Sequence, residues 1–148
     1  MTSITGNGLI RADPPFLVYP YGTVVRLTAI PAPGSFFALW GHDATGNPQP
    51  FTFDTTNANP AVSALLVPLS SNQVSLTVIG NGRGSVSISP PGNVFPAGQA
   101  VIIAASPEAG EKFLSWKGDV AGTDNPLNLT LSISKVIVAD FSGGIIPI

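Results

Sequence analysis

"WKGDVAGTDNPLNLTL" runs from Trp116 to Leu131, and 76 residues earlier the chain reads "WGHDATGNPQPFTFD", from Trp40 to Asp54. Each stretch has a tryptophan, an aspartate three residues later, a loop rich in Gly, Asn and Pro, and then an alternating segment. Because these features keep one order in both places, they predict a single structural unit that occurs twice.

The match extends on both sides of these stretches, from Gly6 to Pro48 in the first copy and from Gly80 to Pro126 in the second. The opening Gly-Asn-Gly triplets are 74 residues apart, which predicts two additional residues before the Pro-Pro of the second copy, and the closing "VSALL" and "IVADF" are 75 apart. Between them, identical residues recur 76 positions apart: Pro14/Pro90, Pro20/Pro96, Gly22/Gly98, Pro31/Pro107, Gly34/Gly110, Phe37/Phe113, Trp40/Trp116, Asp43/Asp119 and Gly46/Gly122.

The hydrophobic pattern is that of β-strands. Val74–Val78, Ser85–Ser89 and Leu127–Ile133 alternate apolar and polar residues, whereas Val24–Ile30 and Ala100–Ser106 are more uniformly apolar and are expected to be the most buried strands. Fifteen prolines and sixteen glycines interrupt these runs. The pattern predicts an all-β protein of small antiparallel or mixed sheets, sandwich-like or grasp-like, with little or no helix.

We expect three segments along the chain. Residues 1–70 form a first β module whose N-terminal strand is shortened, residues 71–142 form a second module, and residues 143–148 are an apolar tail. The polar stretch "LSSNQ", Leu69–Gln73, marks the junction between the two copies.

Composition excludes several functional classes. Eight acidic residues against six basic ones leave no positive field for nucleic acid, and no stretch is apolar over the roughly 18 residues that would predict a membrane span. The chain has no cysteine, so disulfides and thiol chemistry are excluded. The first ten residues lack a basic segment followed by an apolar one, so an exported chain would have lost its signal segment before this numbering begins.

The second copy resembles the divergent internalin-B-type repeat of bacterial surface proteins. The residues that carry this resemblance are Gly-Asn-Gly, Pro-Pro, "FPAGQAVIIAASPEAGEKFLSWKGDVAGTDNPLNLTL" and "KVIVADF". The first copy departs from the pattern, because "WGHD" stands in place of Trp-x-Gly-Asp and Leu65-Leu66 replace the end of Val-x-Ala-x-Phe. The resemblance implies a small β-rich module in secreted or wall-associated proteins, without catalytic residues to carry over.

Trp40 and Trp116, with the nearby Asp43 and Asp119, form one candidate ligand face. An exposed indole offers a flat apolar surface to a sugar ring, which would make the chain a carbohydrate-binding module. The alternative is a structural corner in which each tryptophan anchors a core. Alternation along the strand would place Trp40 on the side opposite Phe37.

The two aspartates also have two interpretations. Asp43 and Asp119 precede Gly- and Asn-rich loops, where carboxylates accept hydrogen bonds from backbone N–H groups. Calcium is the alternative, because Asp119, Asp124 and Asn125 gather three oxygen-bearing side chains within seven residues. The Asn-Gly pairs that open each copy are interpreted as hairpin turns and not as phosphate-binding loops.

Nothing in the sequence predicts catalysis or a bound cofactor. His42 is the only histidine, so His clusters are excluded and it would have to act alone as a base. We therefore expect no enzymatic activity, no cofactor and no metal centre.

The two ends of the chain predict self-association. A shortened first strand containing Ile4 offers a sheet edge, and Ile145, Ile146 and Ile148 lie in an apolar tail outside the repeat pattern, so strand addition between copies is expected. The alternative is that both ends are the cut ends of a longer repeat array. The sequence favours an extracellular or cell-surface structural or adhesive module that spaces domains or forms fibres, with surface glycans as the alternative partner.

Overall fold

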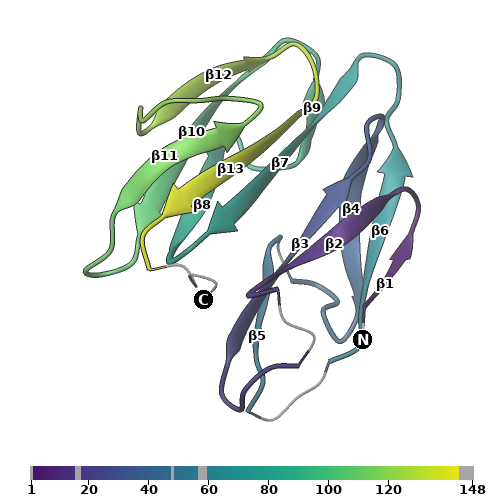
Figure 1. Cartoon of the computed structure of the whole chain (residues 1–148). Coiled ribbons are helices and arrows are strands. Elements are labelled where there is room, and N and C mark those ends of the chain that lie inside the picture. The colour runs from purple at the N-terminus through teal and green to yellow at the C-terminus, as the bar shows by residue number, and fades with distance from the viewer. Residues whose placement is uncertain (1, 16–17, 48, 57–59, 144–148) are drawn as a thin grey trace. The chain divides into compact units, whose positions relative to one another are not determined.

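The computed structural model describes residues 2–15, 18–47, 49–56 and 60–143, and all regular secondary structure in these ranges is β-strand. The chain divides into two compact units, Met1–Leu69 (module 1) and Ser70–Ile148 (module 2) (Figure 1). The all-β prediction is confirmed. Among the described residues, no helix has the length and apolar character needed to span a membrane.

Module 1 contains two three-stranded sheets. One is mixed and has the order β1-β6-β4, in which β1 and β6 are parallel and β6 and β4 antiparallel, and the other is antiparallel with the order β2-β3-β5. The strands are β1 (Thr2–Thr5), β2 (Gly8–Asp13), β3 (Val24–Pro31), β4 (Ser35–His42), β5 (Phe51–Asp54) and β6 (Val62–Pro68).

Module 2 repeats this arrangement and adds one strand. Its mixed sheet has the order β11-β13-β7-β9, with β7 parallel to β13, and its antiparallel sheet has the order β12-β10-β8. The strands are β7 (Gln73–Asn81), β8 (Gly84–Ser89), β9 (Val94–Pro96), β10 (Gln99–Pro107), β11 (Phe113–Gly118), β12 (Leu127–Leu131) and β13 (Lys135–Phe141).

Each pair of sheets encloses its own hydrophobic core. The core of module 2 draws Val101 and Ile103 from one sheet and Trp116 and Ile137 from the other, all at most 2% exposed. The core of module 1 is built in the same way from Val25, Leu27, Trp40 and Val62 among others. Each module is therefore a two-layer sandwich in which one face of each sheet is removed from water.

A β-bulge in the strand that carries the tryptophan changes which side chains face the core. In β4 the register shifts between Phe37 and Leu39, so that Phe37 (6% exposed) and Trp40 (1%) both point inward while Leu39 is 53% exposed. Simple alternation predicts Phe37 opposite Trp40, which is wrong because the bulge inserts one residue between them. β11 has the same bulge, between Phe113 and Ser115.

The glycines that open each copy align differently from the sequence match. Gly8 pairs with Pro31 and Gly84 with Pro107, so the Gly6–Gly8 triplet corresponds to Gly82–Gly84 and lies 76 residues from it. The predicted offset of 74 and the two extra residues in the second copy are therefore wrong. Matching letters are misleading here because the second Gly-Asn-Gly triplet overlaps the end of β7.

The Gly-x-Gly segments are also not hairpin turns, because the strands on either side belong to different sheets. Gly6 (φ +102°) and Gly82 (φ +93°) adopt a left-handed conformation, and a Cβ on either would overlap the backbone carbonyl oxygen of the last strand, at Leu66 or Phe141. Both restrictions select glycine at the crossing between sheets.

Gly82→Ala is expected to lower the free energy of unfolding of module 2 by about 3 kcal/mol, because a methyl group must displace backbone while φ stays positive. Gly110→Ala is the matched control: Gly110 also has a positive φ, but a methyl group added there would meet nothing within 4 Å, so about 1 kcal/mol is expected. Urea unfolding followed by circular dichroism measures both. Equal losses would contradict the close approach at Gly82.

Candidate functional site

The tryptophan of each module lies at the same corner of the core. Trp40 and Trp116 are each 1% exposed. Their rings contact a phenylalanine in nearly identical geometry: the centroids of Phe37 and Trp40 are 4.9 Å apart at 55°, and those of Phe113 and Trp116 are 4.9 Å apart at 56°. The structure therefore places both indoles as core anchors, and neither presents a face on which a sugar could stack.

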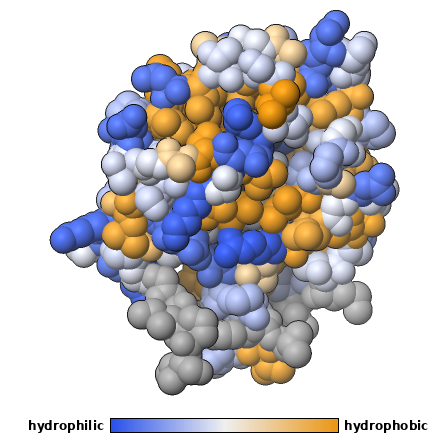
Figure 2. Space-filling model, turned by 45° about the horizontal axis from the view of Figure 1, so that its top comes forward, coloured by the Kyte–Doolittle hydropathy of each residue, from blue (hydrophilic) through white to orange (hydrophobic). Residues whose placement is uncertain are grey.

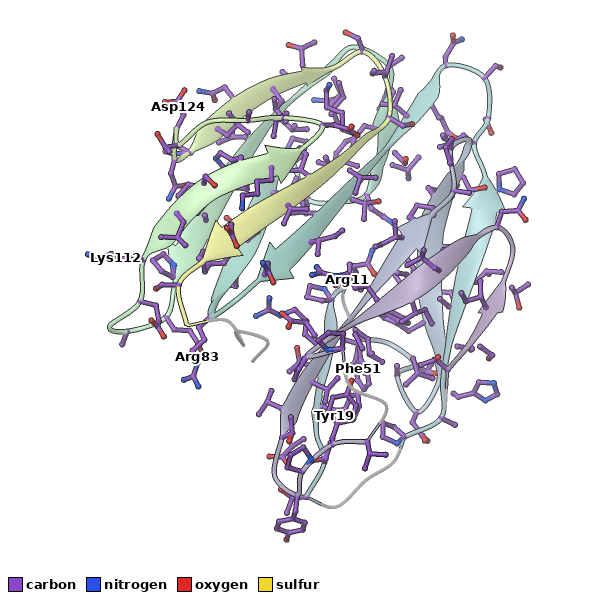
Figure 3. All side chains as sticks on the ribbon, viewed as in Figure 1. Arg11, Tyr19, Phe51, Arg83, Lys112 and Asp124 are labelled. Atoms are coloured by element: carbon purple, nitrogen blue, oxygen red, sulfur yellow. The ribbon has the colours of Figure 1, made fainter. Side chains whose placement is uncertain are left out.

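The edge of the second indole is also engaged. Trp116 Nε1 donates a hydrogen bond of 2.6 Å to the carbonyl oxygen of Asp124. Asp124 lies in the loop that leads into β12 (Figure 3). This bond satisfies the polar atom of a buried ring and fixes the loop over it.

Asp43 and Asp119 bind the beginning of the last strand of their modules. Asp119 donates its backbone N–H to the carbonyl oxygen of Val136 (2.9 Å), and its Oδ2 accepts the Val136 N–H (2.7 Å). Asp43 makes the same two bonds with Ala61, at 2.9 and 2.8 Å. The predicted role as acceptor of backbone N–H groups holds, but the partner lies 17 or 18 residues later in the chain and not in the adjacent turn.

A second side chain pairs with the backbone in each module, and sequence reasoning missed it. The carboxamide of Asn125 donates to the carbonyl oxygen of Ala105 (2.9 Å) and accepts its N–H (2.8 Å). Gln49 makes the equivalent pair with Ala29, at 3.0 and 2.7 Å. An amide side chain carries one donor and one acceptor, as a backbone residue does, so it adds one more rung to the ladder that β12 or β5 forms.

Gln49 and Asn125 both precede a proline joined by a cis peptide bond. The available sequence signal is an amide residue before the proline that leads into a strand. The sequence match pairs Asn47-Pro48 with Asn125-Pro126, and that pairing is wrong at Asn47, whose side chain instead donates to the carbonyl oxygen of Ala44. The true counterpart of Asn125 is Gln49. Because the two residue types differ, the sequence match does not show that they are equivalent.

The oxygen-bearing side chains proposed as calcium ligands are largely committed to these contacts. The Asp119 carboxylate accepts a backbone N–H and the Asn125 carboxamide is bound at both of its ends. Within the described ranges there is no group of three or more His, Asp or Glu side chains arranged to hold a metal.

His42 occupies the position at which the second copy has Gly118. Both residues have positive φ, +55° and +86° respectively. The change from "WKGD" to "WGHD" therefore retains the left-handed turn that delivers the aspartate to the last strand. His42 is exposed on this turn.

Two further sets of polar contacts differ between the modules. Lys117 Nζ lies 3.0 Å from Asp140 Oδ2, and Asn81 donates to Asp140 Oδ1 at 2.9 Å, which links three neighbouring strands of module 2. In module 1 the exposed Asp54 carboxylate accepts hydrogen bonds from the hydroxyl and backbone N–H of Thr56, and these bonds hold the pKa of Asp54 below its ordinary value.

The candidate self-association residues are only partly described. Ile4 lies on β1 and is 38% exposed. Ile145, Ile146 and Ile148 lie outside the described residues.

Comparison with known proteins identifies the repeat. Residues 2–65 and 74–144 each match the divergent InlB B-repeat domain. The search of curated proteins and the search of solved structures returned no match.

Asn125→Ala is expected to destabilise module 2 by about 2 kcal/mol, because two hydrogen bonds are lost and the N–H and carbonyl of Ala105 are left without this partner. Asn128→Ala, on the exposed side of β12, is the control and should change stability by less than about 0.5 kcal/mol. Chemical denaturation measures both variants. Similar losses of stability in the two variants would contradict a stabilising role for the Asn125 carboxamide.

Acrylamide quenching tests the burial of the indoles. With both tryptophans 1% exposed, emission should be quenched far less in the folded chain than in urea, and sugars should produce no saturable change. Quenching in the folded chain that approaches the unfolded value would restore the sugar-stacking hypothesis.

Proposed function

Because the chain belongs to the divergent InlB B-repeat family, we propose that it is a non-enzymatic structural module of a bacterial surface protein, which spaces and holds other parts of that protein outside the cell. A self-associating form of the same role is included, since repeated modules of low charge can pack against one another.

The parallel pairing of the first and last strands of each module carries this proposal. Leu76–Asn81 pair with Lys135–Asp140 in module 2, and Thr2–Thr5 pair with Val62–Leu65 in module 1. When two neighbouring strands are parallel, the chain enters one strand and leaves the other at opposite ends. Tension between the ends of a module therefore acts along these strands and loads their hydrogen bonds together in shear, instead of opening them one at a time.

The aspartate contacts reinforce the same element. Asp119 binds Val136 at the start of β13, on the side opposite β7, and Asp43 binds Ala61 immediately before β6. The last strand is thus held on both sides at the end where it enters the sheet. A module that transmits tension gains from this arrangement, because the loaded strand cannot peel away from its outer neighbour first.

The surface supports packing against neighbours. Charged residues make up 9% of the chain, and exposed apolar side chains include Leu39 and Ile102 at 53% and 46% exposure. On the face drawn in Figure 2, apolar residues (orange) lie among hydrophilic ones (blue). With a formal net charge of -2, little electrostatic repulsion would oppose close packing of such surfaces.

The alternative, a carbohydrate-binding module, depends on Trp40 and Trp116 as stacking platforms. Both indoles lie in the cores, so no observation on these residues favours that alternative.

Single-molecule stretching tests the load-bearing role. With handles at the two ends of the chain, module 2 should unfold at a higher force than module 1, because among the described residues its first and last strands share six residue pairs against four. In a control, module 2 is pulled from Asn81 and Asp140, which face each other at one end of the same two parallel strands, so that the residue pairs open one at a time. Equal forces in the two pulling directions would contradict the proposal.

A further inference from the structure

Among the described residues, the two sheets of module 2 end in four edge strands, β11 and β9 in one sheet and β12 and β8 in the other. The edge of β11 is occupied, because the N–H of Trp116 donates to the carbonyl oxygen of Gly122 (2.8 Å). On β12, the carbonyl oxygen of Thr130 accepts the N–H of Ser132 (3.1 Å). β9 has only three residues. Within the described part of module 2, β8 is therefore the longest edge without such a contact.

The backbone of β8 alternates between its partner strand and this free edge. On β10, Ala105 directs both of its backbone groups to Asn125, on the side of β12. Neighbouring residues of an antiparallel strand point their backbone groups in opposite directions, so Ala104 directs its groups to Ser87 on β8. The N–H and carbonyl of Ser87 therefore face β10, and those of the residues on either side of it face the free edge.

Val86 and Ile88, the residues on either side of Ser87, carry these edge-facing backbone groups. Their side chains are half-buried and pack against the core of module 2, whereas Ser87 is exposed. Gly84–Ser89 contains no charged residue and no proline, and its register with β10 has no bulge. Charge, proline and bulges are the features by which proteins prevent an edge strand from pairing with another chain. β8 is thus a sheet edge to which a further strand can be added.

The corresponding edge of module 1 carries charge. β2 pairs with β3 in the register in which β8 pairs with β10, and this places Arg11 at the position of Ser87 and Asp13 at that of Ser89. Charges on an edge strand oppose pairing, because like charges directly opposite each other are destabilising. The two modules therefore share this strand but differ in the property that controls strand addition.

We propose that β8 pairs with β8 of a second copy of the chain, antiparallel and around a two-fold axis that passes through Ser87. The inference rests on the self-associating form of the proposed function and names the surface through which two copies meet. The antiparallel sheets of the two copies then form one continuous sheet, with β8 of each copy at its centre.

The sequence of β8 is complementary to itself around this axis. Val86 of each copy lies opposite Ile88 of the other, and the two exchange backbone hydrogen bonds because both direct their N–H and carbonyl groups to the free edge. Ser85 lies opposite Ser89, and Ser87 lies opposite itself, on the exposed face. Apolar side chains thus meet apolar ones on the core side, and hydroxyls meet hydroxyls on the other, which are favourable cross-strand pairs.

Other positions of the axis fit less well. An axis at Val86 would place Ile88 opposite Gly84, which has no side chain to pack against. An axis at Ile88 would place Val86 opposite Pro90, which has no backbone N–H to donate. An axis between two residues would set core-facing side chains against solvent-facing ones. Ser87 is therefore the expected centre.

Such a contact is isologous and closes after two copies, because each copy contributes the same edge. The paired segment, Ser85–Ser89, is short, so the association is expected to be weak in dilute solution and stronger where copies are held side by side. Copies attached to one cell surface meet that condition.

Disulfide cross-linking tests the axis. The chain has no cysteine, so Ser87→Cys provides a single thiol. In the dimer the two thiols lie opposite each other at a non-hydrogen-bonded pair, where the Cα atoms are about 4.5 Å apart and a disulfide can form. Under mild oxidation this variant should give a covalent dimer at least about tenfold faster than Asn128→Cys. Asn128 is the control because it is exposed on β12, at the other edge of the sheet. Equal rates in the two variants would overturn the proposal.

Charge at Ser87 supplies a second test. Ser87→Lys and Ser87→Glu should each weaken self-association about fivefold in sedimentation equilibrium, because like charges then face each other across the axis. An equimolar mixture of the two should associate again, since unlike charges face each other, and the control Asn128→Lys should associate as the unmodified chain does. Circular dichroism shows that each variant is folded. If the mixture associates as weakly as its components, the axis does not pass through Ser87 and the inference is wrong.

The outcome can be separated from the function on which the inference rests. If the chain is monomeric at all concentrations and Ser87→Cys gives no covalent dimer, the strand-addition site is wrong. The load-bearing role is measured on single molecules, by the comparison of pulling directions within module 2, so that result does not depend on association.

Discussion

Each module depends on the pairing of its first strand with its last. These strands are separated by more than fifty residues in both copies, and every other strand of the module is formed between them. Their parallel pairing closes the mixed sheet and requires the chain to cross to the second sheet and return. The Gly-x-Gly crossing follows directly, because the chain leaving the first strand passes against the carbonyl oxygen of Leu66 or Phe141 at the end of the last one.

Side chains complete the ladders where strands run out. Asp43 and Asp119 extend the pairing of β4 and β11 with the last strand of their modules. Gln49 extends the pairing of β5 with β3, and Asn125 extends that of β12 with β10. In each case a donor and an acceptor are presented together, which is the arrangement a backbone residue offers. Short strands can thus form sheets whose backbone groups remain satisfied, and short strands are what the frequent prolines and glycines impose.

Much of this architecture could be predicted from the sequence, because it depends on local patterns. The paired tryptophans, the alternating runs and the Pro and Gly positions indicate two all-β copies. Three features could not be predicted. The bulge beside Phe37 inserts a residue without changing composition, and the equivalence of Gly6 and Gly82 depends on pairing with distant strands. Gln49 and Asn125 differ in residue type, and their equivalence depends on the three-dimensional position of an amide group.

The two copies also differ at positions where the fold does not require a particular residue type. At the positions of Lys117, Asp140 and Asn81, which form a charged network on module 2, module 1 has Gly41, Leu65 and Thr5. The tryptophan, the aspartate contact and the amide contact are present in both. The shared residues hold the sandwich together, and the same sandwich forms with different residues at those three positions. The two modules therefore differ in these polar contacts, whereas they share the tryptophan corner that first draws attention in the sequence.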